Sequence, residues 1–167
     1  MNLYLDTSAL LKLYIREPGS ADMQRLLRAS LLTATSWVGY VEVVSALTRA
    51  VRMKMLSRNS ASRKLAQFQH QWGDLFHIEV TTVVITRAAP LAWEYGLRAY
   101  DSLHLASALI WQEMLAEPVT LATYDLQLWE TAPKVGLCHF HQQTPAEHRP
   151  LCNLREGKPP RSSILRS

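Results

Sequence analysis

The feature that most constrains the fold is an alternation of short apolar runs with segments of helical periodicity over the first 140 residues. The first run, NLYL, alternates little and is typical of a strand buried on both faces. Strands that alternate with helices predict an α/β fold, a three-layer α/β/α sandwich with a central parallel sheet. We expect strands over 2–5, 31–36, 76–80, 119–125 and 136–140, and helices over 7–14, 20–30, 37–54, 59–75, 81–96, 99–115 and 126–132.

Local signals predict several helix ends and buried faces. Thr7 or Ser8 is suited to cap the first helix and Ser20 the second, while Gly96 is suited to end the helix before residue 99. The five tryptophans fall on apolar helical faces, which predicts core positions. In the segment 37–54 the helical spacing predicts a shared face for Val38, Val41, Ser45 and Val51.

Composition excludes several classes of protein. With 48% apolar and 19% charged residues, the chain suits an ordered globular domain rather than a disordered one. The longest stretch free of charged residues, 29–41, is shorter than the roughly 20 residues of a membrane span. The apolar run at the N-terminus has no basic region before it and is interrupted by Asp6, so no secretory signal is predicted. Two cysteines, Cys138 and Cys152, are too few for a disulfide framework. We therefore expect a cytoplasmic protein without a membrane span or a disulfide.

The positive charge of the chain is unevenly distributed. We expect one domain over 1–140 and a basic, flexible C-terminal tail over 141–167, because the tail lacks periodicity and holds most of the net charge of +4. A second basic segment without any acid suggests contacts with RNA phosphates, although a solvated helix face explains it at least as well. Its six residues are Arg49, Arg52, Lys54, Arg58, Arg63 and Lys64.

Four acidic residues stand against apolar sequence. Asp6 and Asp125 follow apolar strands, and ligands of open parallel sheets bind beyond the carboxyl ends of the strands. Asp101 opens a helix whose next eleven residues carry no charge, and Glu42 has only apolar neighbours. Taken singly, each has a plain explanation as a helix cap, a first-turn acid or a solvated side chain. Taken together, they predict one acidic cluster.

Such a cluster needs a cation, because converging carboxylates repel each other and raise each other's pKa values. Mg²⁺ or Mn²⁺ prefers oxygen ligands and leaves positions open for phosphate oxygens. Ions bound in this way can activate a water and stabilise the oxygen that leaves a phosphorus atom. We therefore predict hydrolysis of phosphodiester bonds, with Ser8 and Thr123 in supporting positions beside Asp6 and Asp125.

In this order the residues resemble the PIN-domain family of metal-dependent ribonucleases, in particular the VapC-type toxins. The segments that match are LDTSALLKLY, YVEVVSAL, GLRAYDSLHLASAL and TLATYDLQLW. The resemblance covers about residues 1–140 and implies that Asp6, Glu42, Asp101 and Asp125 bind Mg²⁺ or Mn²⁺ for cutting RNA. It further implies a homodimer and a cognate antitoxin that keeps the toxin silent. The tail after Phe140 and the large Tyr124 before Asp125 depart from the family pattern.

Other interpretations account for parts of the same sequence. A phosphatase of the haloacid dehalogenase type needs a second aspartate where Ser8 stands. A catalytically silent PIN-like RNA-binding or regulatory module would retain the fold without the chemistry. His104 suits a buried, hydrogen-bonded histidine better than a ligand of Mg²⁺. A zinc site is not favoured, because the spacings of its candidate ligands match no compact pattern; these are Cys138, His139, His141, His148 and Cys152.

Overall fold

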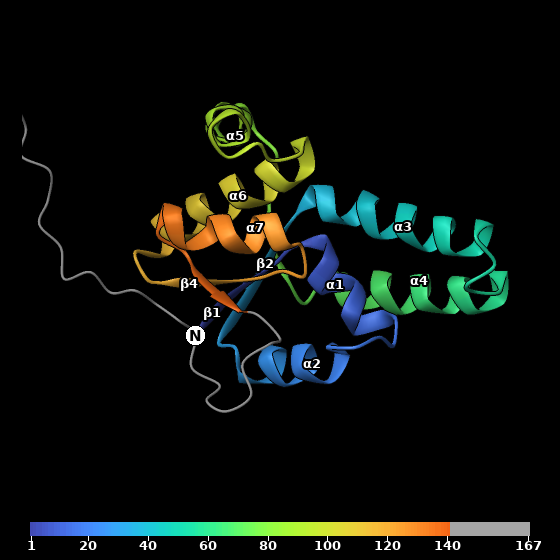
Figure 1. The fold of residues 1–167 in the computed structure, drawn as a ribbon. Helices are drawn as coiled ribbons and strands as arrows, with labels where there is room; N and C mark the ends of the chain where they lie inside the picture. Colours follow the sequence, from blue (N-terminus) through green and yellow to red (C-terminus); the bar gives the residue numbers. More distant parts are fainter. Residues whose placement is uncertain (141–167) are drawn as a thin grey trace, which may run out of the picture.

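The computed structural model describes residues 1–140. A five-stranded parallel sheet in the order β3-β2-β1-β4-β5 forms its centre (Figure 1). In the register of the sheet, Tyr4 on the central strand lies between Ala34 and Leu121. The strands are β1 (Asn2–Leu5), β2 (Leu32–Ser36), β3 (Phe76–Ile78), β4 (Val119–Ala122) and β5 (Cys138–Phe140).

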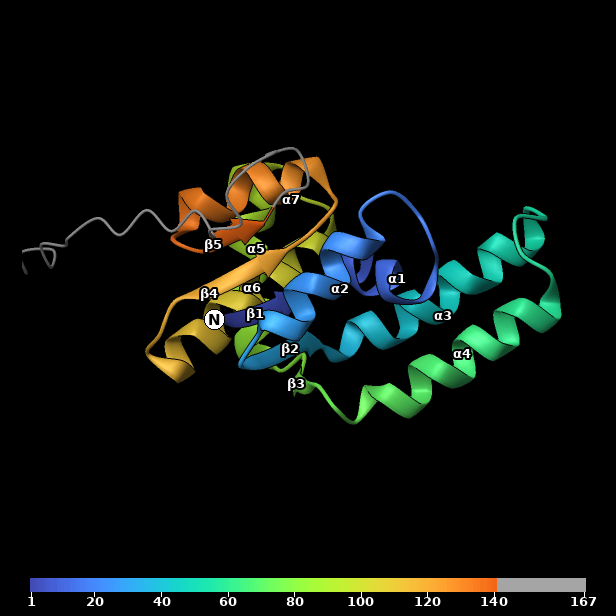
Figure 2. The ribbon, with the colours of Figure 1, turned by 90° about the horizontal axis from the view of Figure 1, so that it is seen from below.

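Helices cover both faces of this sheet. Figure 1 shows α5, α6 and α7 on one side of the strands and α2 on the other, and Figure 2 shows α3 and α4 extending together away from the sheet. The described helices are α1 (Thr7–Tyr14), α2 (Ser20–Ala29), α3 (Trp37–Arg52), α4 (Arg58–Trp72), α5 (Thr82–Tyr95), α6 (Ala99–Leu115), α7 (Leu126–Thr131) and the short 3₁₀-helix η1 (Ala132–Val135).

Each face of the sheet has its own apolar core. Tyr4 points to the face that α5, α6 and α7 cover, where it packs with side chains such as Leu105 and Leu128. Leu3 and Leu5 point to the opposite face, where they pack with residues of α1, α2, α3 and α4. All three β1 side chains are fully buried, as expected for a strand with helices on both sides. The predicted α/β/α sandwich with a parallel sheet is therefore confirmed.

The predicted helix caps are partly wrong. The N-cap of α1 is Asp6, whose carboxylate accepts a hydrogen bond from the backbone of Ala9. Thr7 and Ser8 instead lie inside the helix, and Ser20 is the first residue of α2 after an N-cap at Gly19. A carboxylate is a stronger acceptor for helix N–H groups than a hydroxyl, which explains the preference for aspartate. The predicted end of α5 at Gly96 is confirmed, with a left-handed φ of 64°.

The predicted buried faces need two corrections. In α3 the buried residues are Gly39, Val43 and Leu47, whereas Val41 is 66% exposed. The small Gly39 permits close approach of α3 to its neighbours, so the buried face follows packing rather than the apolar count. The expectation that every tryptophan lies in the core is wrong for Trp93, which is 92% exposed, and for Trp37, which is 46% exposed.

Some expectations concern residues beyond position 140. The predicted tail 141–167 lies outside the described residues, as do His141, His148 and Cys152 of the disfavoured zinc site. The expectation of no disulfide is wrong for Cys138, which is disulfide-bonded in the structure. Within residues 1–140, no helix is both long enough and apolar enough to span a membrane.

Candidate active site

The candidate site lies where the chain order of the sheet reverses. β1 and β4 are neighbours in the sheet, and the connections from them lead to helices on opposite sides. Asp6 follows β1 directly, while Thr123 and Asp125 follow β4. Such a switch point is the usual ligand-binding position of an open parallel sheet.

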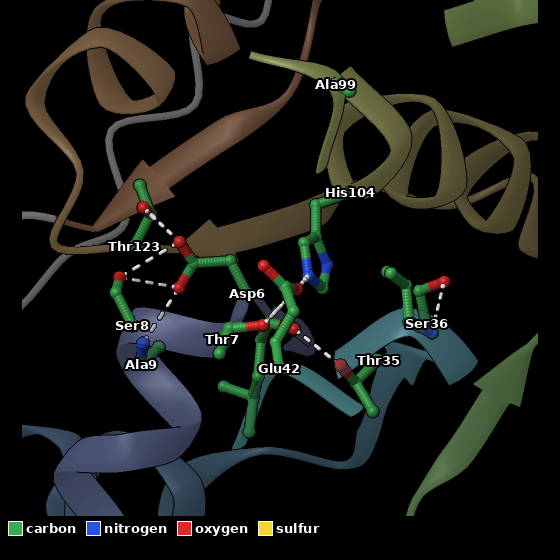
Figure 3. A network of polar contacts seen from close by, with 12 residues as sticks. Asp6, Thr7, Ser8, Ala9, Thr35, Ser36, Glu42, Ala99, His104 and Thr123 are labelled. Carbon is green, nitrogen blue, oxygen red and sulfur yellow. Dashed lines mark hydrogen bonds and ion pairs between the residues drawn. The ribbon is translucent and has the colours of Figure 1, made fainter. Parts of the chain in front are cut away.

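Asp6 is only 4% exposed, and three hydrogen-bond donors contact its carboxylate. Its Oδ1 accepts from the backbone N–H of Ala9 over 2.8 Å, and its Oδ2 accepts from the Thr123 hydroxyl over 2.6 Å. The Ser8 hydroxyl lies 2.8 Å and 2.9 Å from the two oxygens, and Figure 3 shows these contacts. Burial raises the pKa of Asp6, while the nearby His104 and these donors oppose that effect.

The same two hydroxyls join α1 to the segment after β4. Ser8 Oγ accepts from the backbone N–H of Tyr124 over 2.7 Å. Thr123 Oγ1 accepts from the backbone N–H of Asp125 over 3.0 Å. Each hydroxyl thus donates to Asp6 and accepts from the segment that carries Asp125. Ser8 and Thr123 therefore lie where the sequence predicts supporting residues.

Glu42 reaches the site from the middle of α3. Its Oε2 accepts from the Thr7 hydroxyl over 2.6 Å and lies 2.9 Å from His104 Nε2 (Figure 3). Burial acts to raise the pKa of Glu42, but the hydrogen bonds from His104 and Thr7, together with the electrostatic effect of the nearby His104, outweigh it, so the pKa is lowered. Glu42 therefore stays ionised beside the other acids.

Asp101 lies in the first turn of α6 and is half-buried. Within residues 1–140, its carboxylate has no hydrogen-bond donor. Burial raises its pKa, and the charges of Asp125, Asp6 and Glu42 raise it further, whereas Arg98 opposes them. The other three acids therefore lie close enough to repel it.

Asp125 caps α7. Its Oδ1 accepts from the backbone N–H of Leu128 over 2.9 Å, and Oδ2 accepts no hydrogen bond within residues 1–140. The structure thus brings all four predicted acids to one edge of the sheet, from the starts of three helices and the middle of a fourth.

The donor set suits a hard divalent cation. It consists of carboxylate and hydroxyl oxygens, which are the ligands that such cations prefer. A bound cation would also relieve the repulsion between Asp101 and the other three carboxylates. No three Asp, Glu, His or Cys side chains within residues 1–140 already surround a point where a metal would sit. Mg²⁺ commonly keeps several waters and binds through one or two carboxylates, so waters can bridge the remaining acids.

The predicted RNA-binding residues lie on the α3–α4 pair, away from the sheet (Figure 2). Arg49, Arg52 and four others follow one another from the end of α3 into α4. Five of the six are exposed, whereas Lys64 is partly buried and donates to the backbone carbonyl of Tyr14 over 2.6 Å. Lys64 is therefore engaged within the protein.

Sequence reasoning missed two residues of the site. The sequence indicates Thr7 only as a possible cap, yet its hydroxyl holds Glu42. Arg98 is the cation that opposes repulsion at Asp101, and the spacing of three residues in RAYD is the signal that could have found it. The prediction that His104 is a buried, hydrogen-bonded histidine is confirmed, since it is 2% exposed and both ring nitrogens have partners.

Comparison with known proteins decides the family. A model of the PIN domain matches residues 3–132. The chain belongs to the PIN-domain family. Ribonuclease VapC46 of Mycobacterium tuberculosis (strain ATCC 25618 / H37Rv) is 32% identical to this PIN domain protein over 136 residues, which are 81% of this chain and 93% of the relative.

Solved structures share the fold of this PIN domain. A toxin–antitoxin complex from Klebsiella pneumoniae superposes with a TM-score of 0.59 at 17% identity, covering 78% of this chain and 92% of that one. VapBC2 from Rickettsia felis, bound to a DNA fragment from its promoter, gives a TM-score of 0.59 at 16% identity, covering 84% and 100%. At these identities the comparison bears on the fold alone.

Proposed function

We propose that this PIN-domain protein is an endoribonuclease that hydrolyses phosphodiester bonds within RNA and acts as the toxin of a toxin–antitoxin pair. The observation that carries the proposal is the arrival of Asp6, Glu42, Asp101 and Asp125 at one edge of the sheet, where burial and the charges of the other three raise the pKa of Asp101. Its similarity to a relative named as a ribonuclease supports the same activity.

Mg²⁺ or Mn²⁺ is the proposed cofactor. Asp101 and Asp125 each present a carboxylate oxygen without a partner in the described chain, and Glu42 presents Oε1. Asp6 would complete the set of ligands. When bound, a divalent ion would lower the pKa of a bound water and stabilise the oxygen that leaves phosphorus.

The residues of this chain would set the geometry for that chemistry. Ser8 and Thr123 hold the Asp6 carboxylate in one orientation, each through its single hydroxyl proton. Thr7 and His104 hold Glu42. Fixed carboxylates at a half-buried edge would orient the attacking water in line with the phosphorus, which is the positional part of catalysis.

The basic residues of α3 and α4 would contact RNA. Arg49, Arg52, Lys54, Arg58 and Arg63 are exposed, and within residues 1–140 none of them pairs with a carboxylate. Contacts from such residues to phosphates position an RNA without specifying its sequence. Lys64 would contribute less, because its ammonium group is engaged with Tyr14.

Two protein partners belong to the proposal. An antitoxin would cover the acidic edge and bring a cation, such as an arginine, to the carboxylates. A second copy of the chain would cover exposed apolar side chains of α5, among them Val83, Ile85 and Trp93, because exposed apolar surface commonly marks an interface. We also propose that the protein works in the cytoplasm.

The test is an RNA cleavage assay of the purified protein with Mn²⁺, with Mn²⁺ and a chelator, and with Asp101→Asn. Cleavage that requires Mn²⁺ and disappears in the variant supports the proposal. Cleavage that survives both the chelator and the substitution would sink it. Binding of RNA and Mn²⁺ without any cleavage would favour a catalytically silent regulatory module instead.

A further inference from the structure

Two buried residues, Tyr4 and His104, contact the candidate site without belonging to its acidic set. Tyr4 is fully buried on β1, and His104 on α6 is 2% exposed. The Tyr4 hydroxyl lies 3.0 Å from His104 Nδ1, and Nε2 lies 2.9 Å from Glu42 Oε2. The contacts therefore run from the central strand, through the imidazole ring, to Glu42.

The chemistry of the two ends sets the direction of these hydrogen bonds. An ionised carboxylate can only accept, so His104 Nε2 carries a proton and donates it to Glu42. In the neutral ring, Nδ1 is then an acceptor, and the phenol of Tyr4 donates to it. The Tyr4 hydroxyl thus selects the ring tautomer that serves Glu42.

Both donors to Glu42 meet the same carboxylate oxygen. Thr7 Oγ1 lies 2.6 Å and His104 Nε2 lies 2.9 Å from Oε2. No residue within 1–140 donates to Oε1. The carboxylate is therefore fixed through one oxygen, while the other remains for a ligand that the protein does not supply.

Close packing of α3 brings Glu42 to this ring. A Cβ atom at Gly39 would lie 3.2 Å from Thr35 Oγ1 and 3.5 Å from His104 Cε1. Glycine inside a helix lowers stability by about 0.5–1 kcal/mol relative to alanine. Gly39, three residues before Glu42, is thus an unfavourable residue for a helix, but any larger side chain there would crowd Thr35 and His104.

We infer that Tyr4 and His104 are positioning residues that orient Glu42, with Oε1 presented to a divalent cation. The cation itself rests on the proposed function. Some residues hydrogen-bond to a metal ligand without binding the metal themselves. Replacing such a residue commonly changes metal affinity by about 10–100-fold. The effect is expected on metal affinity and on kcat, whereas the KM for RNA should change little.

The experiment is calorimetric titration of the full-length protein with Mn²⁺ in the absence of RNA. His104→Leu is expected to weaken Mn²⁺ binding about 10–100-fold. His104→Gln should restore most of the affinity, because its amide nitrogen can donate to Glu42 in place of Nε2. The matched control is His77→Leu, which removes another imidazole that bonds to the Trp72 carbonyl.

Tyr4→Phe tests the same chain of contacts independently, in case the His104 variants do not fold. Its matched control is Tyr14→Phe, which removes a hydroxyl from the other core. Tyr4→Phe should weaken Mn²⁺ binding while Tyr14→Phe leaves it unchanged. Nitrogen NMR of the metal-free wild type should find the His104 proton on Nε2. A proton on Nδ1 alone would overturn the inference.

The two proposals can fail separately. A wild-type protein that binds Mn²⁺ but cleaves no RNA contradicts the ribonuclease function. The positioning inference is then decided by the Mn²⁺ affinities of the variants alone. Folded His104→Leu and Tyr4→Phe proteins that bind Mn²⁺ as tightly as the wild type overturn the positioning inference, whatever the protein cleaves.

Discussion

Replacing Thr123 with valine tests whether a buried hydroxyl holds the Asp6 carboxylate. Valine resembles threonine in shape, so the main change is the loss of the hydroxyl. Thr123 is 1% exposed, and its hydroxyl donates to Asp6 over 2.6 Å and accepts from the Asp125 N–H over 3.0 Å. The substitution therefore removes one hydrogen bond to a charged group and one acceptor for a backbone donor.

The structure sets the size of the expected effect. A hydrogen bond to a charged group contributes about 1.5–3 kcal/mol, and a buried donor without a partner costs about 1–3 kcal/mol. Because Asp125 is half-buried, water can satisfy its N–H in part. We therefore expect Thr123→Val to lower the free energy of unfolding by about 2–4 kcal/mol in metal-free protein at neutral pH.

Urea unfolding monitored by circular dichroism measures this loss, provided that the transition is two-state. The matched control is Thr131→Val, because Thr131 is 2% exposed and donates over 2.7 Å to the uncharged carbonyl of Gln127. That change should cost about 1 kcal/mol. If Thr123→Val is no more destabilising than Thr131→Val, the hydroxyl does not stabilise a buried charge.

The pH dependence adds a second check. Burial raises the pKa of Asp6 above its ordinary value of 3.8, and loss of a donor raises it further. A carboxyl with a raised folded-state pKa loses stability as the pH rises through that value. The deficit of Thr123→Val should therefore be largest at neutral pH and shrink as acid protonates Asp6. A deficit that does not change with pH would contradict a charged Asp6.

Three further predictions follow from the same geometry. Because burial and the other acids raise the pKa of Asp101, its charge should lower stability above the ordinary value of 3.8; Asp101→Asn should raise the Tm of chelator-treated protein at pH 7 and not at pH 3. RNA binding measured by fluorescence anisotropy gives a slope of log affinity against log salt concentration. Changing both Arg49 and Arg52 to Glu should make that slope shallower by about 1.4, because about 0.7 is lost for each phosphate contact. Gly39→Ala should place a Cβ 3.2 Å from Thr35 Oγ1, change the free energy of unfolding by less than about 1 kcal/mol because helix propensity improves, and weaken Mn²⁺ binding in calorimetry.

The sequence predicted the edge of the sheet where the acids meet because two local signals sufficed. Apolar runs identified β1 and β4, and the carboxyl ends of parallel strands share one edge. Asp6 and Asp125 were placed there by chain position alone. The contacts of Glu42 could not be predicted in this way, since its partner Thr7 is 35 residues away and His104 is 62 residues away. Only the packing of α1, α3 and α6 brings these residues together.

The sequence also presented capping and ligand binding as alternatives for the aspartates, whereas the geometry allows both. Asp125 accepts from the helix backbone through Oδ1 and leaves Oδ2 without a donor within residues 1–140. Asp6 caps α1 through Oδ1 and accepts from Thr123 through Oδ2. A carboxylate has about four acceptor positions, so a cap does not exhaust it. A helix cap at a strand end is therefore compatible with a functional role.

The four carboxylates are stabilised in different ways in the metal-free protein, and the comparison shows which of them depends most on a cation. Asp6, Asp101 and Asp125 stand at the N-terminal ends of α1, α6 and α7, where the helix dipole favours negative charge. Glu42 lies in the middle of α3 without that help, and it has Thr7 and His104 as donors instead.

Asp101 differs from the other three because it has the dipole but no hydrogen-bond donor within residues 1–140, and burial together with three neighbouring charges raises its pKa. If a divalent cation completes this site, Asp101 gains most from its arrival. The carboxyl group of Asp101 should therefore show the largest fall in pKa when Mg²⁺ is added, as carbon NMR of the aspartate side chains can measure. A larger fall at Asp6, which its three donors already stabilise, would contradict this ranking.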